Sequence, residues 1–175
     1  MGAGKTATCR ELLHLLGRCV FLDGDWCWQM EPFVVTDETK RMVQGNIVHL
    51  LRSFLCCSEY ENVLFCWVMQ EEAIMDALLT QLSGLDFTLH KFTLTLSPQA
   101  LGRHIALDVE RGARTPDVLA RSLERLPLYA RMDTVKIDVS DISAQQAARR
   151  IADAVLGKHA AQAGAQASAP ERKDG

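Results

Sequence analysis

The sequence predicts an α/β protein with three layers, α/β/α, in which helices cover both faces of a parallel sheet. Short continuous apolar runs, typical of strands buried on both faces, alternate with longer segments whose apolar residues recur at helical spacing. Such alternation indicates βαβ units and therefore parallel strands. In addition, the chain opens on a glycine-rich segment that runs straight into the first helix.

The predicted elements follow one another in regular order, and several helices start at a residue that can cap them. Thr36 and Ser143 each precede a helix, and Ser97 precedes another whose first residue is Pro98. Gly17 ends the opening helix. The predicted strands are residues 19–22, 62–68, 87–96 and 134–139, and the predicted helices are residues 4–17, 37–57, 71–82, 99–110, 116–126 and 144–156.

One domain is predicted, over residues 1–156. The length of 175 residues agrees with this, since a domain usually has about 100–200 residues. After Gly157 the sequence is rich in alanine and contains no large apolar residue. Residues 157–175 are therefore predicted to be a disordered tail.

The most specific motif is Gly-Ala-Gly-Lys-Thr at residues 2–6, where the opening helix begins. A bound phosphate needs several converging N–H donors, and small residues let the backbone approach it closely. Lys5 is expected to reach the outer phosphates and the Thr6 hydroxyl to bind Mg²⁺. An accidental glycine-rich start is the alternative, but the helix that begins at the lysine disfavours it. The expected nucleotide-binding residues of the loop are Gly2, Ala3, Gly4, Lys5, Thr6 and Ala7.

The loop contains only the second half of the full pattern G-x-x-x-x-G-K-[ST], because the first glycine would fall before Met1. In this architecture the strand ahead of the loop lies in the middle of the sheet, and without it neighbouring strands keep unpaired backbone groups. The sequence therefore predicts a sheet that lacks its first, central strand. Two explanations are open. Either Met1 is an internal methionine and a strand precedes it, which we favour, or the chain is a truncated and inactive remnant.

A second motif, Leu-Asp-Gly-Asp at residues 22–25, follows the first predicted strand. With it, the sequence resembles the P-loop kinases of small molecules, which include nucleotide, nucleoside, shikimate, gluconate and adenylylsulfate kinases. The motif is most similar to the adenylylsulfate-kinase form. Residues 1–156 also resemble uncharacterised bacterial proteins described as nucleotide kinases or AAA-family ATPases. The resemblance implies the P-loop NTPase fold, ATP and Mg²⁺ as cofactors, and transfer of a γ-phosphoryl group.

Acidic and aromatic residues follow the first strand, at the sheet edge where doubly wound proteins bind ligands. Asp25 is the expected catalytic carboxylate, because phosphoryl transfer needs a group that orients or deprotonates the acceptor. Asp23 is expected to hold Mg²⁺ through water. The alternative is a turn that is rich in Asp and Gly for conformational reasons. Trp26 and Trp28 are candidates either for stacking on the acceptor or for packing on the neighbouring helix.

Arginines recur in residues 103–125, where the resemblance places the lid of these kinases. Arg103 matches the arginine that lies over adenine, but the position one turn later, usually arginine, is Leu107. Arg111 and Arg114 are the candidates for neutralising charge on the transferred phosphoryl group. The altered spacing leaves open which of the two does so. The alternative for each is an exposed, solvated arginine. Two further candidates lie a turn apart on the next helix, Arg121 and Arg125.

Composition and charge exclude several classes of protein. Lys and Arg number 19 against 22 Asp and Glu, a net charge of −3, so a nucleic-acid partner is not expected. The apolar run at residues 62–70 is much shorter than the about 18–20 residues of a membrane span. The six cysteines include no C-x-x-C pair, which argues against a zinc or redox site. These features, without a signal-peptide pattern, predict a cytoplasmic protein. Whether it is a monomer or a homodimer stays open.

The sequence thus predicts an ATP-dependent phosphotransferase that acts on a small molecule such as a nucleoside or nucleotide. Two alternatives stay open. The first is an ATP-binding module without transfer activity, or a truncated inactive paralogue. The second is an ATPase that acts on macromolecules. The ATPase is disfavoured because residues 64–70 contain no acidic residue for a Walker B motif.

Overall fold

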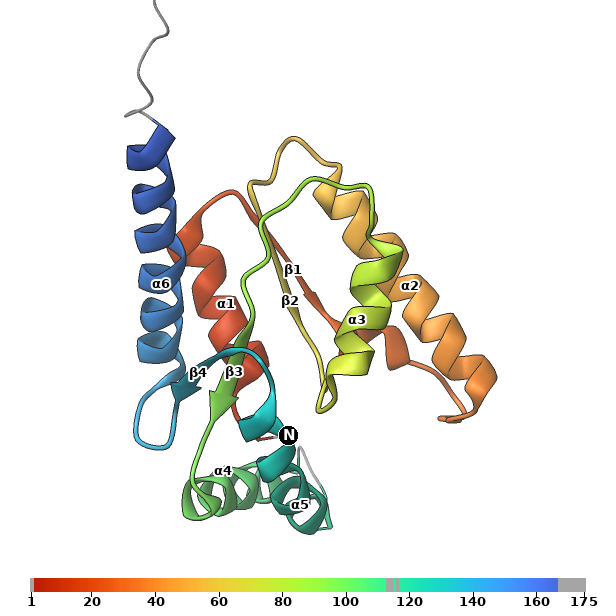
Figure 1. Ribbon diagram of the computed structural model, residues 1–175. Helices are drawn as coiled ribbons and strands as arrows, with labels where there is room; N and C mark the ends of the chain where they lie inside the picture. Colours follow the sequence, from red (N-terminus) through yellow and green to blue (C-terminus); the bar gives the residue numbers. More distant parts are fainter. Residues whose placement is uncertain (1, 113–114, 116, 167–175) are drawn as a thin grey trace, which may run out of the picture.

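The computed structural model describes residues 2–112, 115 and 117–166, with side chains described as far as residue 157 (Figure 1). Within these residues helices and strands alternate in the predicted order, which confirms the α/β class. The strands are β1 (Cys19–Asp23), β2 (Asn62–Cys66), β3 (Phe92–Thr95) and β4 (Val135–Asp138), and the helices are α1 (Lys5–Leu16), the 3₁₀ helix η1 (Gly24–Trp28), α2 (Asp37–Leu55), α3 (Glu72–Gln81), α4 (Pro98–Glu110), α5 (Val118–Arg131) and α6 (Ala144–Gln166).

The described strands form two parallel sheets of two strands each. β1 pairs with β2 in a register that sets Cys19 beside Asn62, and β3 pairs with β4 with Phe92 beside Val135. No pairing joins β2 to β3 in the described part of the chain. β3 starts at Phe92 rather than at the predicted residue 87, because β4 offers a partner strand only from Val135 onward. The division of the sheet agrees with the prediction that a central strand is lacking.

Helices cover both faces of the strands, which confirms the three-layer prediction (Figure 1). α2 and α3 pack beside β1 and β2, where buried Leu22 and Ile47 belong to one core. α1 and α6 pack beside β3 and β4, where Leu12 and Ile151 belong to a second core. α4 and α5 pack on each other below the carboxyl ends of the strands. No helix in the described residues is long and apolar enough to cross a membrane.

Three predicted helix starts, those of α2, α4 and α6, are fixed by side-chain caps, the last by the hydroxyl of Ser143. The Thr36 hydroxyl accepts a hydrogen bond from the backbone N–H of Thr39 at 3.2 Å, and the Thr39 hydroxyl accepts one from the N–H of Thr36 at 2.9 Å. Thr39 thus takes the place of the glutamate that usually completes such a capping box. At α4, Ser97 accepts from the N–H of Ala100, and Pro98 is in the first turn.

Two helices are longer than predicted. α5 continues past Pro127 to Arg131, because half-buried Tyr129 and buried Met132 hold its end against the body of the protein. α6 continues past residue 156 to Gln166, in a segment that is rich in alanine, the residue with the highest helix propensity. The predicted disordered tail therefore starts as helix, and residues 167–175 lie outside the described part of the chain.

Candidate functional site

The glycine-rich loop leaves the amino-terminal end of α1 open. Gly2 and Gly4 have φ angles of 80° and 75°, in the left-handed region that glycine adopts without strain. Gly4 is the N-cap of α1, and no side chain accepts a hydrogen bond there. The N–H groups of the first turn have no partner within the helix, and the helix dipole adds positive charge, so this end can bind a phosphate. The half-buried Lys5 belongs to the same turn.

Helix α4 fixes the loop in place, a contact that the sequence did not predict. The His104 ring donates from Nδ1 to the carbonyl oxygen of Gly2 at 3.1 Å. A Cβ atom on Gly2 would lie 3.0 Å from Leu101 Cδ1 and 3.1 Å from Ile105 Cγ1, so glycine also permits close packing. His104 had no predicted role, because its spacing from the other histidines and from the cysteines fits no ligand pattern.

The two residues predicted to hold Mg²⁺ meet at the start of α1. The Thr6 hydroxyl donates to Asp23 Oδ2 at 2.5 Å. Asp23 ends β1 and is only 5% exposed, and its Oδ1 accepts a hydrogen bond from the backbone N–H of Asp25 at 3.1 Å. Both carboxylate oxygens therefore have donors, as a buried carboxylate requires. These bonds hold a hydroxyl and a carboxylate together at the open amino-terminal end of the helix.

This pair of oxygen donors fits a magnesium ion. Mg²⁺ prefers oxygen ligands and usually combines one or two protein groups with waters and substrate phosphates. In the described residues, no three His, Cys, Asp or Glu side chains gather as a metal site made of protein ligands alone. Thr6 and Asp23 therefore fit an ion that is held jointly with the phosphates of a nucleotide.

Asp25 is exposed in η1, in contrast to Asp23. Its charge acts on Tyr129 of α5: burial raises the pKa of the Tyr129 phenol, Arg125 lowers that pKa, and Asp25 raises it. The Tyr129 hydroxyl is also buried without a hydrogen-bond partner in the described part of the chain. The phenol of Tyr129 on α5 is therefore close enough to Asp25 to interact with it electrostatically.

The two tryptophans of η1 have different surroundings. Trp26 is 46% exposed and meets Phe21 edge to face, with ring centroids 5.2 Å apart. Trp28 is half-buried, lies 6.0 Å from Phe33 between ring centroids, and packs on the core below α2. Trp26 thus keeps an exposed ring at the sheet edge, whereas Trp28 packs on the neighbouring helix, one of the two roles considered for it.

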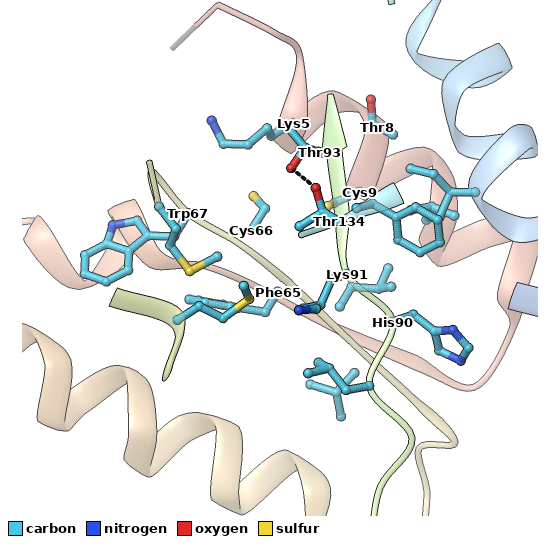
Figure 2. Close-up of a pocket in the computed structure, with 18 of the residues that line it drawn as sticks. Lys5, Thr8, Cys9, Phe65, Cys66, Trp67, His90, Lys91, Thr93 and Thr134 are labelled. Atoms are coloured by element: carbon cyan, nitrogen blue, oxygen red, sulfur yellow. Dashed lines mark hydrogen bonds between the residues drawn. The ribbon is translucent and has the colours of Figure 1, made fainter. Parts of the chain in front are cut away.

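Trp67 also reaches this edge, although the sequence placed it inside a strand. It follows β2 directly, and a Cβ atom on buried Gly24 would lie 2.5 Å from its Cγ. Gly24 is therefore needed for close packing of the indole ring, which explains part of the composition of the Asp-Gly-Asp turn. Figure 2 shows Lys5 extending on the side of the site where Trp67 lies.

The predicted arginines lie at separate places on α4 and beyond it. Arg103 donates to the carbonyl oxygen of Ser140 and to Asp141, both at 3.3 Å, and this ion pair is exposed. Arg103 thereby joins α4 to the segment after β4. Arg111 is exposed at the end of α4, and Arg114 lies outside the described residues.

A cavity of about 590 Å³ opens beside the glycine-rich loop, between the two sheets (Figure 2). We name it the inter-sheet cavity. Lys5, Cys9 and Cys66 are among the residues that line it. A hydrogen bond between the two thiols lowers the pKa of Cys9 and raises that of Cys66, which burial raises further. Figure 2 shows Cys66 and Phe65 of β2 on one side of the cavity and Thr93 of β3 on the other.

Comparison with solved structures shows that the fold is shared with a known kinase. A gluconokinase from Sinorhizobium meliloti 1021 superposes with a TM-score of 0.59 at 20% identity, over 90% of this chain and 92% of that chain. A tunicamycin resistance protein from Deinococcus radiodurans superposes with a TM-score of 0.62 at 20% identity, over 89% of this chain and 90% of that chain. No curated protein sequence matches the chain.

A family profile described as an AAA domain matches residues 1–123, which include the glycine-rich loop, both aspartates after β1 and the whole of α4. The match covers more than half of the chain. This chain therefore belongs to the AAA domain family, and it shares its fold with the gluconokinase.

Proposed function

We propose that the protein is an ATP-dependent phosphotransferase that moves the γ-phosphoryl group of ATP to a hydroxyl or phosphate group of a small molecule. The observation that supports this most is the bond between Thr6 and Asp23, which brings a hydroxyl and a carboxylate to the open end of α1. The AAA-domain match and the likeness to a gluconokinase support the same class of reaction.

In this proposal the glycine-rich loop binds the phosphates of ATP, and the aspartates at the end of β1 and in η1 act on the metal and the acceptor. The N–H groups of the first turn of α1 and Lys5 bind the phosphates, and Lys5 neutralises charge that develops during transfer. Thr6 and Asp23 hold Mg²⁺, which, when bound, lowers the negative charge that the acceptor oxygen meets. Asp25 accepts the proton of the acceptor hydroxyl as its oxygen bonds to phosphorus and the bond to the ADP oxygen breaks.

The acceptor is expected beside η1. Asp25 and the exposed ring of Trp26 follow β1 together, so an acceptor that contains a planar ring can stack there while its hydroxyl meets the carboxylate. Nucleosides and nucleotides fit this description. Arg103, which contacts the segment after β4, would border adenine, and Arg111 or Arg114 would approach the transferred group.

The test is ADP release from MgATP in the presence of a panel of nucleosides, nucleotides, sugars and sulfated nucleotides. Lys5→Ala should abolish release, because its charge is needed in the transition state. Lys40→Ala removes an exposed lysine that pairs with Asp37 on α2, and this matched control should keep the wild-type rate. Equal turnover in wild type and Lys5→Ala would contradict the proposal.

An ATP-binding module without transfer activity is the second candidate. The exposure of Arg111 and the ion pair between Arg103 and Asp141 favour it, because the first side chain is solvated and the second is already engaged. Calorimetry distinguishes the two functions. A module should bind MgATP, lose that binding in Lys5→Ala, and release no ADP with any acceptor of the panel.

A further inference from the structure

Two cysteines from separate elements meet close to the start of α1. Cys9 lies in the second turn of that helix, and Cys66 is the last residue of β2. The Cys66 thiol donates a hydrogen bond to the sulfur of Cys9, and Figure 2 shows both side chains beside Lys5. The proposed phosphotransfer uses neither thiol, so their contact calls for a separate explanation.

The fold holds the two sulfurs together through a second contact next to theirs. In the pairing of β1 with β2, Asp23 lies beside Cys66. Asp23 also accepts the hydrogen bond of Thr6 at 2.5 Å. Cys9 follows Thr6 by three residues, so both project from the same face of α1. Thr6 with Asp23 and Cys9 with Cys66 are therefore neighbouring contacts between one helix face and two paired strand ends.

The two cysteines differ in how far they are accessible. Cys66 is buried, with 7% of its surface exposed, whereas Cys9 is half-buried. Both line the inter-sheet cavity, which also contains Lys5. A small polar molecule can therefore reach the sulfur of Cys9 first, and the nearest thiol to the product is that of Cys66.

We propose that Cys9 and Cys66 are a redox modification site, at which hydrogen peroxide converts the two thiols into one reversible disulfide that ties α1 to the end of β2. The proposal does not depend on phosphotransfer. Two thiols in hydrogen-bond contact on rigid elements need only a small side-chain movement to reach the bonding distance of about 2.0 Å.

The reaction balances with peroxide as the oxidant. The Cys9 sulfur bonds to one peroxide oxygen as the O–O bond breaks, which leaves a sulfenic acid on Cys9 and releases one water. The Cys66 sulfur then bonds to the Cys9 sulfur, and the sulfenic oxygen leaves as a second water with the proton of the Cys66 thiol. The two thiols lose two hydrogens in all. Exchange with a thiol reductant restores them.

The experiment treats the folded chain with hydrogen peroxide in a Cys56→Ser background, which removes the exposed thiol and so limits cross-links between chains. After the remaining thiols are blocked, cleavage following lysine, arginine and glutamate places Cys9 in peptide 6–10 and Cys66 in peptide 62–71. Mass spectrometry should find peptide 6–10 joined to peptide 62–71 about tenfold more often than to any other cysteine peptide. Dithiothreitol should separate the two.

Three controls show whether the fold selects this pair. The chain unfolded in guanidinium should join peptide 6–10 to the peptides of other cysteines as well. In Cys66→Ser, Cys9 should stop at the sulfenic acid, which dimedone traps on peptide 6–10. Cys19→Ser removes a half-buried thiol from neighbouring β1 and should keep the cross-link. Circular dichroism checks that each variant keeps its helices.

Stability gives a second readout, because a disulfide between distant residues restricts the unfolded chain. The urea midpoint of the folded chain should rise on oxidation and return on reduction, and it should not move in Cys66→Ser. Three outcomes overturn the proposal. They are oxidation of Cys9 to sulfinic acid without a cross-link in the folded chain, equal yields of peptide 6–10 joined to 62–71 and to other cysteine peptides, and a cross-link that fails to raise the midpoint.

Discussion

Asp23 and Asp25 lie two residues apart, yet their surroundings differ. Asp23 is buried and accepts hydrogen bonds from Thr6 and from a backbone N–H, whereas Asp25 is exposed. A carboxylate whose oxygens are both engaged can hold a metal or orient a hydroxyl, but it is not free to take a proton from an acceptor. Asp23 is therefore the proposed metal ligand, and Asp25, which follows it on the exposed side of the turn, is the proposed base.

Asp25→Asn should reduce phosphoryl transfer by about 10²–10⁴-fold while leaving MgATP affinity unchanged, because the amide cannot accept the proton. Steady-state ADP release and calorimetry give the two quantities. Asp23→Asn is the informative comparison, since it should instead raise the Mg²⁺ concentration needed for half-maximal activity. Wild-type turnover in Asp25→Asn would reduce Asp25 to a residue of the turn.

Gly24→Ala should lower the free energy of unfolding by about 1–3 kcal/mol, because the added Cβ overlaps the Trp67 ring, which is packed and cannot easily move. Urea unfolding followed by circular dichroism measures the change. Gly45→Ala is the control: Gly45 lies within α2 with open space around its Cα, so alanine there should stabilise by about 0.5–1 kcal/mol. A neutral Gly24→Ala would show that the Trp67 ring shifts freely.

At the scale of elements, α1 and β2 meet through a pair of thiols. Cys9 of α1 and Cys66 at the end of β2 share a hydrogen bond, which stabilises the thiolate of Cys9 and disfavours that of Cys66. The bond forms only when α1 lies close to β2, so the pKa of Cys9 is a probe of this contact beside the inter-sheet cavity.

Cys66→Ala should raise the pKa of Cys9, because the hydrogen bond that lowers it is removed. Alkylation by iodoacetamide requires the thiolate, so the midpoint of the rate against pH should move to higher pH for Cys9. Mass spectrometry of the labelled peptides follows each cysteine separately. Exposed Cys56 serves as the internal reference and should keep its profile. An unmoved Cys9 midpoint would contradict the contact.

Elements whose signals are local could be predicted from the sequence, and those that depend on packing could not. The buried runs gave β1 and β2, and capping by Thr36 and Ser97 gave the starts of α2 and α4. The end of α5 lies beyond Pro127 because distant residues support it, which no local pattern contains. The length of α6 follows from the helix propensity of alanine, a signal opposed in the sequence by the lack of large apolar residues after Gly157.

In the candidate site, too, local motifs could be predicted from the sequence, whereas contacts that depend on packing could not. The motif at residues 2–6 and the aspartates after β1 could be placed together, because the carboxyl ends of parallel strands and helix starts share one edge. The contact of His104 with Gly2 and the approach of Trp67 to Gly24 could not, because both join residues from separate elements. Packing decides such contacts, and a sequence pattern alone does not encode them.

At the scale of the whole molecule, two of the three buried clusters in the described residues adjoin the two strand pairs, one around α2 and α3 and one around α6. We expect thermal unfolding of this chain to deviate from a two-state transition. The calorimetric enthalpy should exceed the van't Hoff enthalpy, because the cores are not joined by a continuous sheet. Differential scanning calorimetry measures both enthalpies. Equal values would show that the contacts of the intervening helices suffice to couple the cores.

Helix α1 contacts β1 and β2, which contribute to the core around α2 and α3, and it shares the other core with α6, so it links the two. Its first turn is also the proposed phosphate-binding site. A ligand bound there stabilises the helix by mass action and thereby raises the cost of melting either core separately. Cooperativity of unfolding and occupancy of the nucleotide site would then be linked: the empty protein melts in parts, and the loaded protein melts as a unit. The same helix would set both catalytic competence and resistance of the folded chain to partial opening and proteolysis.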